Sequence, residues 1–433
     1  MINDTGQYHV PVIITILHVI TQYKANHIYF IVYMTIIADY FTLTAKHKEQ
    51  YGETTIVLIQ VGVFFEVYAL RRENGTYIGS DIETFTTMND LVMAKKQSKM
   101  ADDTGVMCDI MQAGFHVDHS EKYINRLQNN GYTIVIYTQD IQAKHTSRSL
   151  TEVISPGTFF TNETTQLTNH IMCIWIHKST ERKLMREQIT IGTAVLDVLT
   201  GYISSSQFNR EFYHTPCTYD ELERIASIYN PSECIIISNL SKKYVDEIIS
   251  FSSIMSKKIH IIDGLSEEYD AVHIADGGAP LGVKINQVAI MDFRTYAQNS
   301  EKQTYQLATI EKFYPDIPCD EIIEMFPTHL IAIQSLTFLL NFVHQHSPNL
   351  VNKLQSPIFE NHSDKLILAN HSLKQLNILT DNKQTGKLSS VSSFLNNCVT
   401  VMGKREFSRI LHNPTTNIEW LNTSYAITEY SLT

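Results

Sequence analysis

The segment that most constrains the fold runs from Ile56 to Tyr68. The apolar run Ile56-Val57-Leu58-Ile59 leads into Gln60-Val61-Gly62-Val63-Phe64-Phe65-Glu66-Val67-Tyr68. This pattern predicts a strand that breaks at Gly62 and resumes with two aromatic side chains and one carboxylate. Because side chains alternate along a strand, Phe64 and Glu66 are expected on the same side. Taken alone, the pattern favours a buried strand with both rings in a core.

A second interpretation of the same residues is chemical. An exposed ring can wedge between stacked bases, and a carboxylate beside it can accept a hydrogen bond from a base edge. The net charge of −11 argues against a binder that holds nucleic acid by bulk electrostatics. A local basic strip remains compatible with that charge.

Length and composition indicate a globular chain of several domains. The 433 residues suffice for about two to four domains, and 43% of them are hydrophobic. The six cysteines are scattered, which is typical of free thiols in a reducing, intracellular compartment. The pairs His116/His119 and His344/His346 have no third ligand nearby, so we expect no metal site. The second pair is expected on the solvated surface.

The chain divides into an amino-terminal extension and three predicted domains. Residues 1–33 hold two apolar runs, each too short to span a bilayer, and Met34 resembles a natural protein start. We therefore expect 1–33 to be an extension or a start-site artefact, which a mature terminus at Met1 would contradict. No membrane association is expected.

The first predicted domain, 34–160, is mixed α/β. Its elements are a helix over Tyr40–Tyr51, the Ile56–Leu70 strands, a turn at Asn74-Gly75, a helix over Met88–Lys99 and a strand over Tyr132–Tyr137.

The second predicted domain, 167–265, has strands first and then strands alternating with helices. That order favours an RNase-H-like α/β fold. Asp197 ends an early strand, where a nuclease of that fold could place a catalytic carboxylate. Neighbouring strands offer no converging carboxylates, so we interpret Asp197 as structural.

The third predicted domain, 283–433, is helical. Apolar residues recur at three-to-four spacing, which predicts helices over Glu301–Phe313, Thr328–His344 and Ser389–His412. The helical pattern continues to the last residues, so we expect this domain to be incomplete.

Four separated segments, in this order, resemble the amino-terminal half of MutS-type DNA mismatch-repair proteins. They are Gly62-Val63-Phe64-Phe65-Glu66, preceded by Lys46, Lys48 and Tyr51; Gln112-Ala113-Gly114-Phe115-His116 through Gln139; Val153-Ile154-Ser155-Pro156-Gly157-Thr158; and Gly386-Lys387-Leu388 through Pro414. The residues of the first segment are most similar to those of giant-virus and octocoral-mitochondrial MutS homologues.

The resemblance implies a fold and a function. The fold would be a mixed α/β mismatch-binding domain, an RNase-H-like connector domain and a truncated helical lever domain. Phe64 would wedge beside a mispaired base, Glu66 would hydrogen-bond to that base, and Phe65 would be the core ring. Candidates for weak contacts to the DNA backbone are Lys46, Lys48, Lys95, Lys96 and Lys99.

The resemblance also implies what this chain does not carry. Family members continue into a clamp and an ATPase domain that uses ATP and Mg²⁺. No segment here fits the phosphate loop Gly-x-x-x-x-Gly-Lys-Ser/Thr. We expect no catalytic residues, cofactor or metal in this chain, and a separate ATPase-bearing polypeptide as a partner.

Three alternatives stay open. The chain could bind DNA structures or act as an interaction module without reading mismatches. It could be an inactive remnant of a split gene. An RNase-H-like nuclease using Asp197 is the third. A viral chain would work in the host cytoplasm, a viral factory or the nucleus.

Overall fold

The computed structural model describes residues 36–139, 148–159, 168–181, 186–262, 293–351, 354–360, 366, 375–378 and 386–432. The chain forms two compact units: residues up to Leu127 with Ile134–Thr151, and Gln128–Thr133 with Glu152–Thr433. The extension expected over 1–33 lies outside the described residues, as do residues 283–292 of the third predicted domain.

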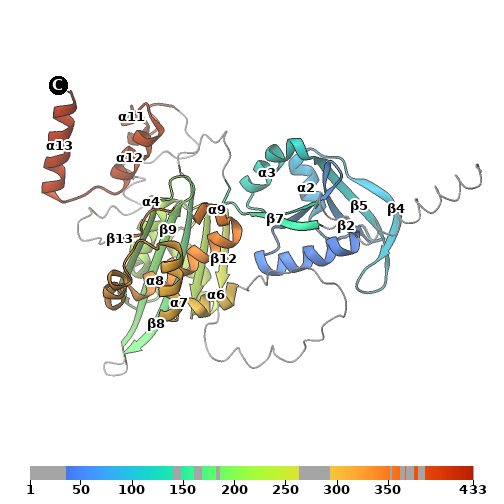
Figure 1. The fold of residues 1–433 in the computed structure, drawn as a ribbon, viewed down its shortest axis with the longest axis horizontal. Coiled ribbons are helices and arrows are strands. Elements are labelled where there is room, and N and C mark those ends of the chain that lie inside the picture. Colours follow the sequence, from blue (N-terminus) through green and yellow to red (C-terminus); the bar gives the residue numbers. More distant parts are fainter. Residues whose placement is uncertain are drawn as a thin grey trace, which may run out of the picture. The chain divides into compact units, whose positions relative to one another are not determined.

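The first unit is a sheet with helices on both faces. Its sheet has the order β4-β5-β2-β1-β6-β7, with β3 beside β2. In Figure 1 the helix over residues 36–51 lies on one face, and α2 and α3 lie on the other. The elements are β1 (Thr55–Val61), β2 (Phe64–Arg71), β3 (Tyr77–Gly79), α2 (Ile82–Asn89), β4 (Ala94–Ala101), β5 (Met107–His116), α3 (Ser120–Asn129), β6 (Thr133–Gln139) and β7 (Arg148–Ile154).

The alternation of side chains along β2 assigns its residues to the two faces. Tyr68 packs edge-to-face on Tyr40 of the helix over 36–51, with ring centroids 5.1 Å apart. Phe65 points the other way and contacts Phe115, with centroids 6.1 Å apart. The expected break at Gly62 and the expected turn at Asn74-Gly75 are both confirmed.

The predicted helix over Met88–Lys99 is wrong. Helix α2 ends at Asn89, because Asp90 adopts a left-handed conformation with φ +54°. The chain then re-enters the sheet as β4, antiparallel to β5. Cross-strand ion pairs to Asp109 account for the strand, since both Lys95 and Lys99 reach that carboxylate.

The second unit contains a mixed sheet of order β12-β11-β8-β9-β10-β13. Strands β8, β9 and β10 are antiparallel, whereas β11 and β12 run parallel to β8. The bounds are β8 (His170–Glu181), β9 (Arg186–Asp197), β10 (Ile203–Glu211), α4 (Asp220–Tyr229), β11 (Glu233–Ser238), α5 (Lys242–Phe251), β12 (Lys258–Ile262) and β13 (Ile358–Phe359). This order of strands and helices is the one expected from the sequence.

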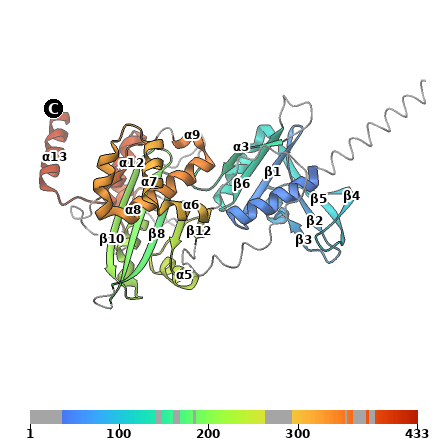
Figure 2. The ribbon, with the colours of Figure 1, turned by 60° about the horizontal axis from the view of Figure 1, so that its bottom comes forward.

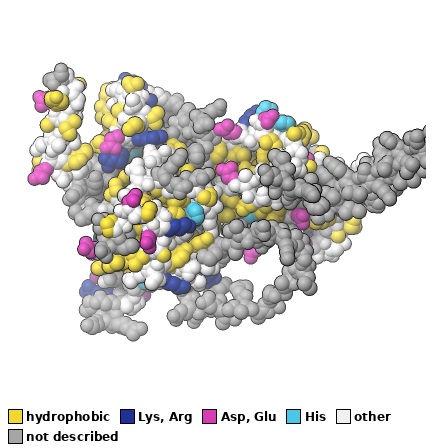
Figure 3. Space-filling view, viewed as in Figure 1, with side chains coloured by type: hydrophobic (Ala, Val, Ile, Leu, Met, Phe, Trp, Pro, Cys, Tyr) yellow, Lys and Arg dark blue, Asp and Glu magenta, His cyan; other side chains and the backbone are white. Residues whose placement is uncertain are grey.

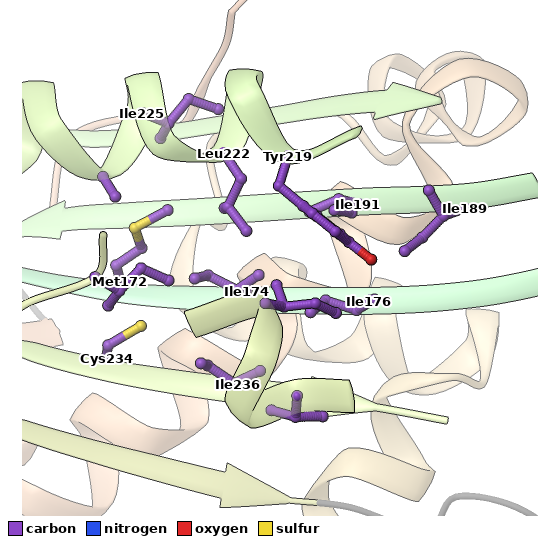
Figure 4. Packing of buried hydrophobic residues seen from close by; sticks show 14 of the residues in the cluster. Met172, Ile174, Ile176, Ile189, Ile191, Tyr219, Leu222, Ile225, Cys234 and Ile236 are labelled. Carbon is purple, nitrogen blue, oxygen red and sulfur yellow. The ribbon is translucent and has the colours of Figure 1, made fainter. Parts of the chain in front are cut away.

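One face of this sheet packs on α4 and α5. Figure 4 shows Leu222 and Ile225 of α4 above Ile174 of β8, within a cluster of fully buried apolar residues. Burial of this apolar surface is the main favourable term for the unit.

The other face carries α6 (Phe293–Ser300), α7 (Gln303–Phe313) and α8 (Cys319–His346) (Figures 1 and 2). Gly192 of β9 lets α8 approach closely, because a Cβ there would lie 2.4 Å from the Ile331 carbonyl carbon. Ser335 Oγ of α8 donates to the Gly192 carbonyl at 3.0 Å. Within the described residues, Ile323–His346 is the one stretch long and apolar enough to cross a membrane, and 72% of it is buried inside the protein.

Two further expectations for the helical region need correction. The predicted helix over Ser389–His412 is broken into α11 (Val391–Leu395) and α12 (Val401–His412), and Thr400 caps the start of α12. His346 is buried at the end of α8, not solvated, and its ring packs on Phe342. Further short elements are α9 (Pro348–Val351) and α13 (Ile418–Leu432).

Helix α13 exposes apolar side chains among the described residues. Tyr430 and Leu432 are more than four-fifths exposed. Figure 3 shows hydrophobic side chains on the surface of this helix.

Candidate nucleic-acid interface

The tip of the β1–β2 hairpin presents an aromatic ring to solvent. Gly62 and Val63 form a two-residue loop between Val61 and Phe64, which are paired across the strands. Gly62 has φ +61°, a conformation that glycine adopts without the Cβ penalty of other residues. The Phe64 side chain is 45% exposed, whereas Phe65 is 5% exposed. Adjacent phenylalanines therefore occupy opposite environments.

Hydrogen bonds fix this tip to the rest of the unit. Val117 N donates to the Val63 carbonyl at 2.9 Å. Gln60 Oε1 accepts from Gln139 N at 3.1 Å, and the Gln60 carbonyl accepts from Arg148 Nε at 2.7 Å. A loop held on both sides presents Phe64 with little loss of freedom on binding.

The ring of Phe64 has a neighbour on β5. Phe64 and His116 are cross-strand partners, and their rings meet edge-to-face with centroids 5.5 Å apart. His116 Nδ1 in turn accepts a hydrogen bond from Asp118 N at 3.3 Å. His119 lies 6.3 Å from His116 by ring centroids, and no group of three metal-ligating side chains is found among the described residues.

Glu66 lies on the same sheet face as Phe64, as the alternation predicts. It pairs with Gly114 of β5, where a Cβ would lie 2.4 Å from the Phe65 carbonyl oxygen and 3.3 Å from Glu66 Cγ. Tyr68 donates a hydrogen bond from its hydroxyl to Glu66 Oε2. Glycine at 114 thus leaves room for the carboxylate.

Lys96 lies near Glu66 on this face. Its Nζ is 5.4 Å from the centre of the Tyr68 ring. Burial lowers the pKa of the Lys96 ammonium, and the negative charge of Glu66 opposes that shift.

The other four lysines lie elsewhere on the first unit. Lys95 Nζ and Lys99 Nζ share Asp109, at 2.7 and 3.5 Å from its carboxylate oxygens. The hydrogen bond from Lys95 lowers the pKa of Asp109 against the opposing effect of burial. Lys46 is exposed on the helix over 36–51, and Lys48 pairs with Glu53 at 3.3 Å. Their role in DNA contact stays a prediction.

Asp197 has the contacts of a turn residue. It is buried at the end of β9 and accepts hydrogen bonds from Asn169 N at 3.1 Å and Thr200 Oγ1 at 2.7 Å. These bonds tie the ends of β8 and β9 to the turn before β10.

Three residues complete the site in roles that the sequence patterns did not assign to them. Tyr68 and Gly114 both lie against Glu66, and His116 contacts Phe64. Tyr68 could have been found from the period-2 alternation, because it lies two positions after Glu66. The positions of Gly114 and His116 opposite β2 depend on how β5 aligns with that strand, and this alignment cannot be inferred from the sequence.

Comparison with known proteins gives the class of this unit. Residues 37–163 match the family model of MutS domain I. The chain as a whole resembles the amino-terminal part of MutS homologues. It is 25% identical to a MutS homologue of Acanthamoeba polyphaga mimivirus over 388 residues, which are 88% of this chain and 33% of that protein.

Two other relatives extend this similarity beyond viruses. A mitochondrial DNA mismatch repair protein MutS homologue of Sarcophyton glaucum is 22% identical, over 89% of this chain and 39% of that protein. DNA mismatch repair protein MutS of Clostridium beijerinckii is 25% identical over 51% of this chain and 22% of that protein. The chain therefore spans about a third of the length of the curated relatives it matches.

Proposed function

We propose that this chain binds double-stranded DNA at mismatches and small loops, as part of DNA mismatch repair. The observation that carries the proposal is the hairpin tip, where Phe64 is exposed and Glu66 shares its face while Phe65 turns into the core. The match of this unit to MutS domain I supports the same function.

Phe64 and Glu66 have different roles in the proposed recognition of a mismatch. The Phe64 ring stacks on the mispaired base from the minor-groove side, and stacking contributes about 1–3 kcal/mol per base. Kinking costs least where base pairing is already weak, so a wedge favours mismatched sites. Glu66 accepts a hydrogen bond from that base. Its charge near phosphates penalises ordinary duplex, which raises discrimination more than affinity.

The experiment compares affinities for a fluorescent duplex with one G·T mismatch or one unpaired base and for the matched homoduplex. We expect the wild-type chain to prefer the mismatched duplex, and Phe64→Ala to reduce that preference about 5- to 150-fold, which corresponds to the stacking energy. The matched control is Tyr213→Ala, which removes a 61% exposed ring from the second unit.

Two outcomes contradict the proposal. One is equal affinity of the wild-type chain for both duplexes, which would favour an inactive remnant or a binder of other DNA structures. The other is a mismatch preference that Phe64→Ala leaves unchanged.

We also propose that the ATP-dependent step of mismatch repair is not carried out by these 433 residues themselves. The support is that these 433 residues contain no Gly-x-x-x-x-Gly-Lys-Ser/Thr phosphate loop. The purified chain is then expected to hydrolyse ATP no faster than a buffer control, with or without mismatched DNA. Turnover that follows the chain through successive purification steps would refute this.

A further inference from the structure

The buried residue Tyr68 touches the carboxylate on which mismatch discrimination is proposed to depend. Its hydroxyl donates to Glu66 Oε2, and its side chain is fully buried. Because this hydroxyl is buried, it does not reach DNA directly and can act on recognition through Glu66.

Tyr68 is itself held from two sides. Tyr40 packs edge-to-face on its ring, with an interplanar angle of 81°. Lys96 Nζ lies 5.4 Å from the centre of the same ring, within cation–π range. The Tyr40 hydroxyl is anchored in turn by the Val57 carbonyl at 3.1 Å and Ser80 Oγ at 2.6 Å. The Tyr68 hydroxyl therefore has a defined position.

We propose that Tyr68 is a positioning residue that fixes the Glu66 carboxylate for base recognition, with Lys96 moderating the charge of that carboxylate. A hydrogen bond to an ionised group is stronger than a neutral one, and it restricts the rotamers of the glutamate before DNA arrives. Lys96 places a positive charge beside the acid, which limits repulsion from phosphates. This inference rests on the proposed function and assigns it two further residues.

The test uses the full chain and the same two duplexes. Tyr68→Phe keeps the ring and its contacts with Tyr40 and Lys96 but removes the hydroxyl. We expect the ratio of homoduplex Kd to mismatch Kd to fall roughly 10- to 150-fold, the range for one hydrogen bond to a charged group. Tyr137→Phe is the matched control, because it removes a buried hydroxyl of the first unit that bonds to His47 Nε2 at 2.8 Å, not to Glu66, and it is expected to leave the ratio unchanged.

A double-mutant cycle separates positioning from a general loss of stability. In a Glu66→Gln background, Tyr68→Phe is expected to change the ratio by less than about 2-fold, since the charged partner is gone. Thermal unfolding of Tyr68→Phe and Tyr137→Phe provides the check on folding.

The possible results are distinct. A wild-type chain without mismatch preference defeats the proposed function, and this inference with it. A wild-type preference that Tyr68→Phe leaves intact, or lowers equally in the Glu66→Gln background, overturns this inference alone.

Discussion

Phe64 and Phe65 are adjacent, yet the sheet assigns them to different environments. Phe65 is buried against Phe115 and Phe64 is half-exposed beside His116. The alternation of side chains along a strand predicts that they separate, but it does not say which ring faces the core. That choice depends on the helices α2 and α3, which cover the Phe65 face.

The two rings are therefore expected to differ in their effect on stability. Phe65→Ala should lower the free energy of unfolding of the first unit by about 3–5 kcal/mol, because it empties a core position. Phe64→Ala should lower it by about 1 kcal/mol or less. Urea unfolding followed by circular dichroism measures both. Equal losses would mean that Phe64 is a core residue as well, and would weaken its role as a wedge.

At the scale of elements, the sequence predicted the order of strands and helices in the second unit but predicted a helix where most of β4 lies. Apolar patterns suffice for much of β8, β9 and β11, because long stretches of these strands are buried on both faces and are rich in apolar residues. Lys95, Lys96 and Lys99 carry no such pattern, and their strand is stabilised by β5 and Asp109, which follow later in the chain. Pairing with a strand that follows later in the chain cannot be predicted from a short stretch of sequence.

A buried ionic contact holds the chain after β7 to the second sheet. Glu233 of β11 is completely buried and accepts hydrogen bonds from Gly157 N at 2.9 Å and His260 Nε2 at 2.7 Å, as well as from the Ser155 hydroxyl. Burial alone would raise the pKa of Glu233, but the hydrogen bond and charge of His260 outweigh it and lower the pKa to about 2. Burial also lowers the pKa of His346, to about 4.

These shifts predict acid sensitivity of the second unit. The folded pKa of Glu233 lies below the ordinary value of 4.5 for a glutamate, so its contribution to stability is present above about pH 4.5 and is lost as the pH falls toward 2. His346 adds a loss between about pH 6.5 and 4, because the unfolded chain binds its proton first. Tryptophan fluorescence during urea unfolding reports this unit, since Trp175 and Trp420 both lie in it.

Glu233→Gln tests the assignment. The substitution should lower stability at pH 7 by about 1–3 kcal/mol, because the amide cannot accept every hydrogen bond that the buried carboxylate accepts, and should flatten the dependence between pH 4.5 and 2. The exposed residue Glu419, changed to Gln, is the control. An unchanged slope in Glu233→Gln would show that other groups cause the acid sensitivity.

At the scale of the whole chain, the proposed recognition of DNA has to be compatible with the negative net charge of the protein. A net charge of −11 disfavours binding to the DNA phosphates, and three of the five candidate lysines are paired with Glu53 or Asp109. Binding that depends on a wedge and a base contact needs few phosphate contacts, so this charge is compatible with discrimination at modest affinity. The order of the motifs along the sequence was enough to indicate the family. The packing around Glu66 could not be predicted in the same way, because it depends on how three strands lie together.

The short strand β13 has a consequence for the outer edge of the second sheet. Ile358 and Phe359 pair with Ser204 and Ser205 of β10, and Glu360 N donates to the Ser205 carbonyl at 2.8 Å. Uncovered strand edges recruit other chains and lead to aggregation. A stretch of two residues, which lies more than 150 positions downstream of its partners, thus shields part of the β10 edge from other molecules. Solubility of the second unit should accordingly depend on residues far outside the segment that builds its sheet.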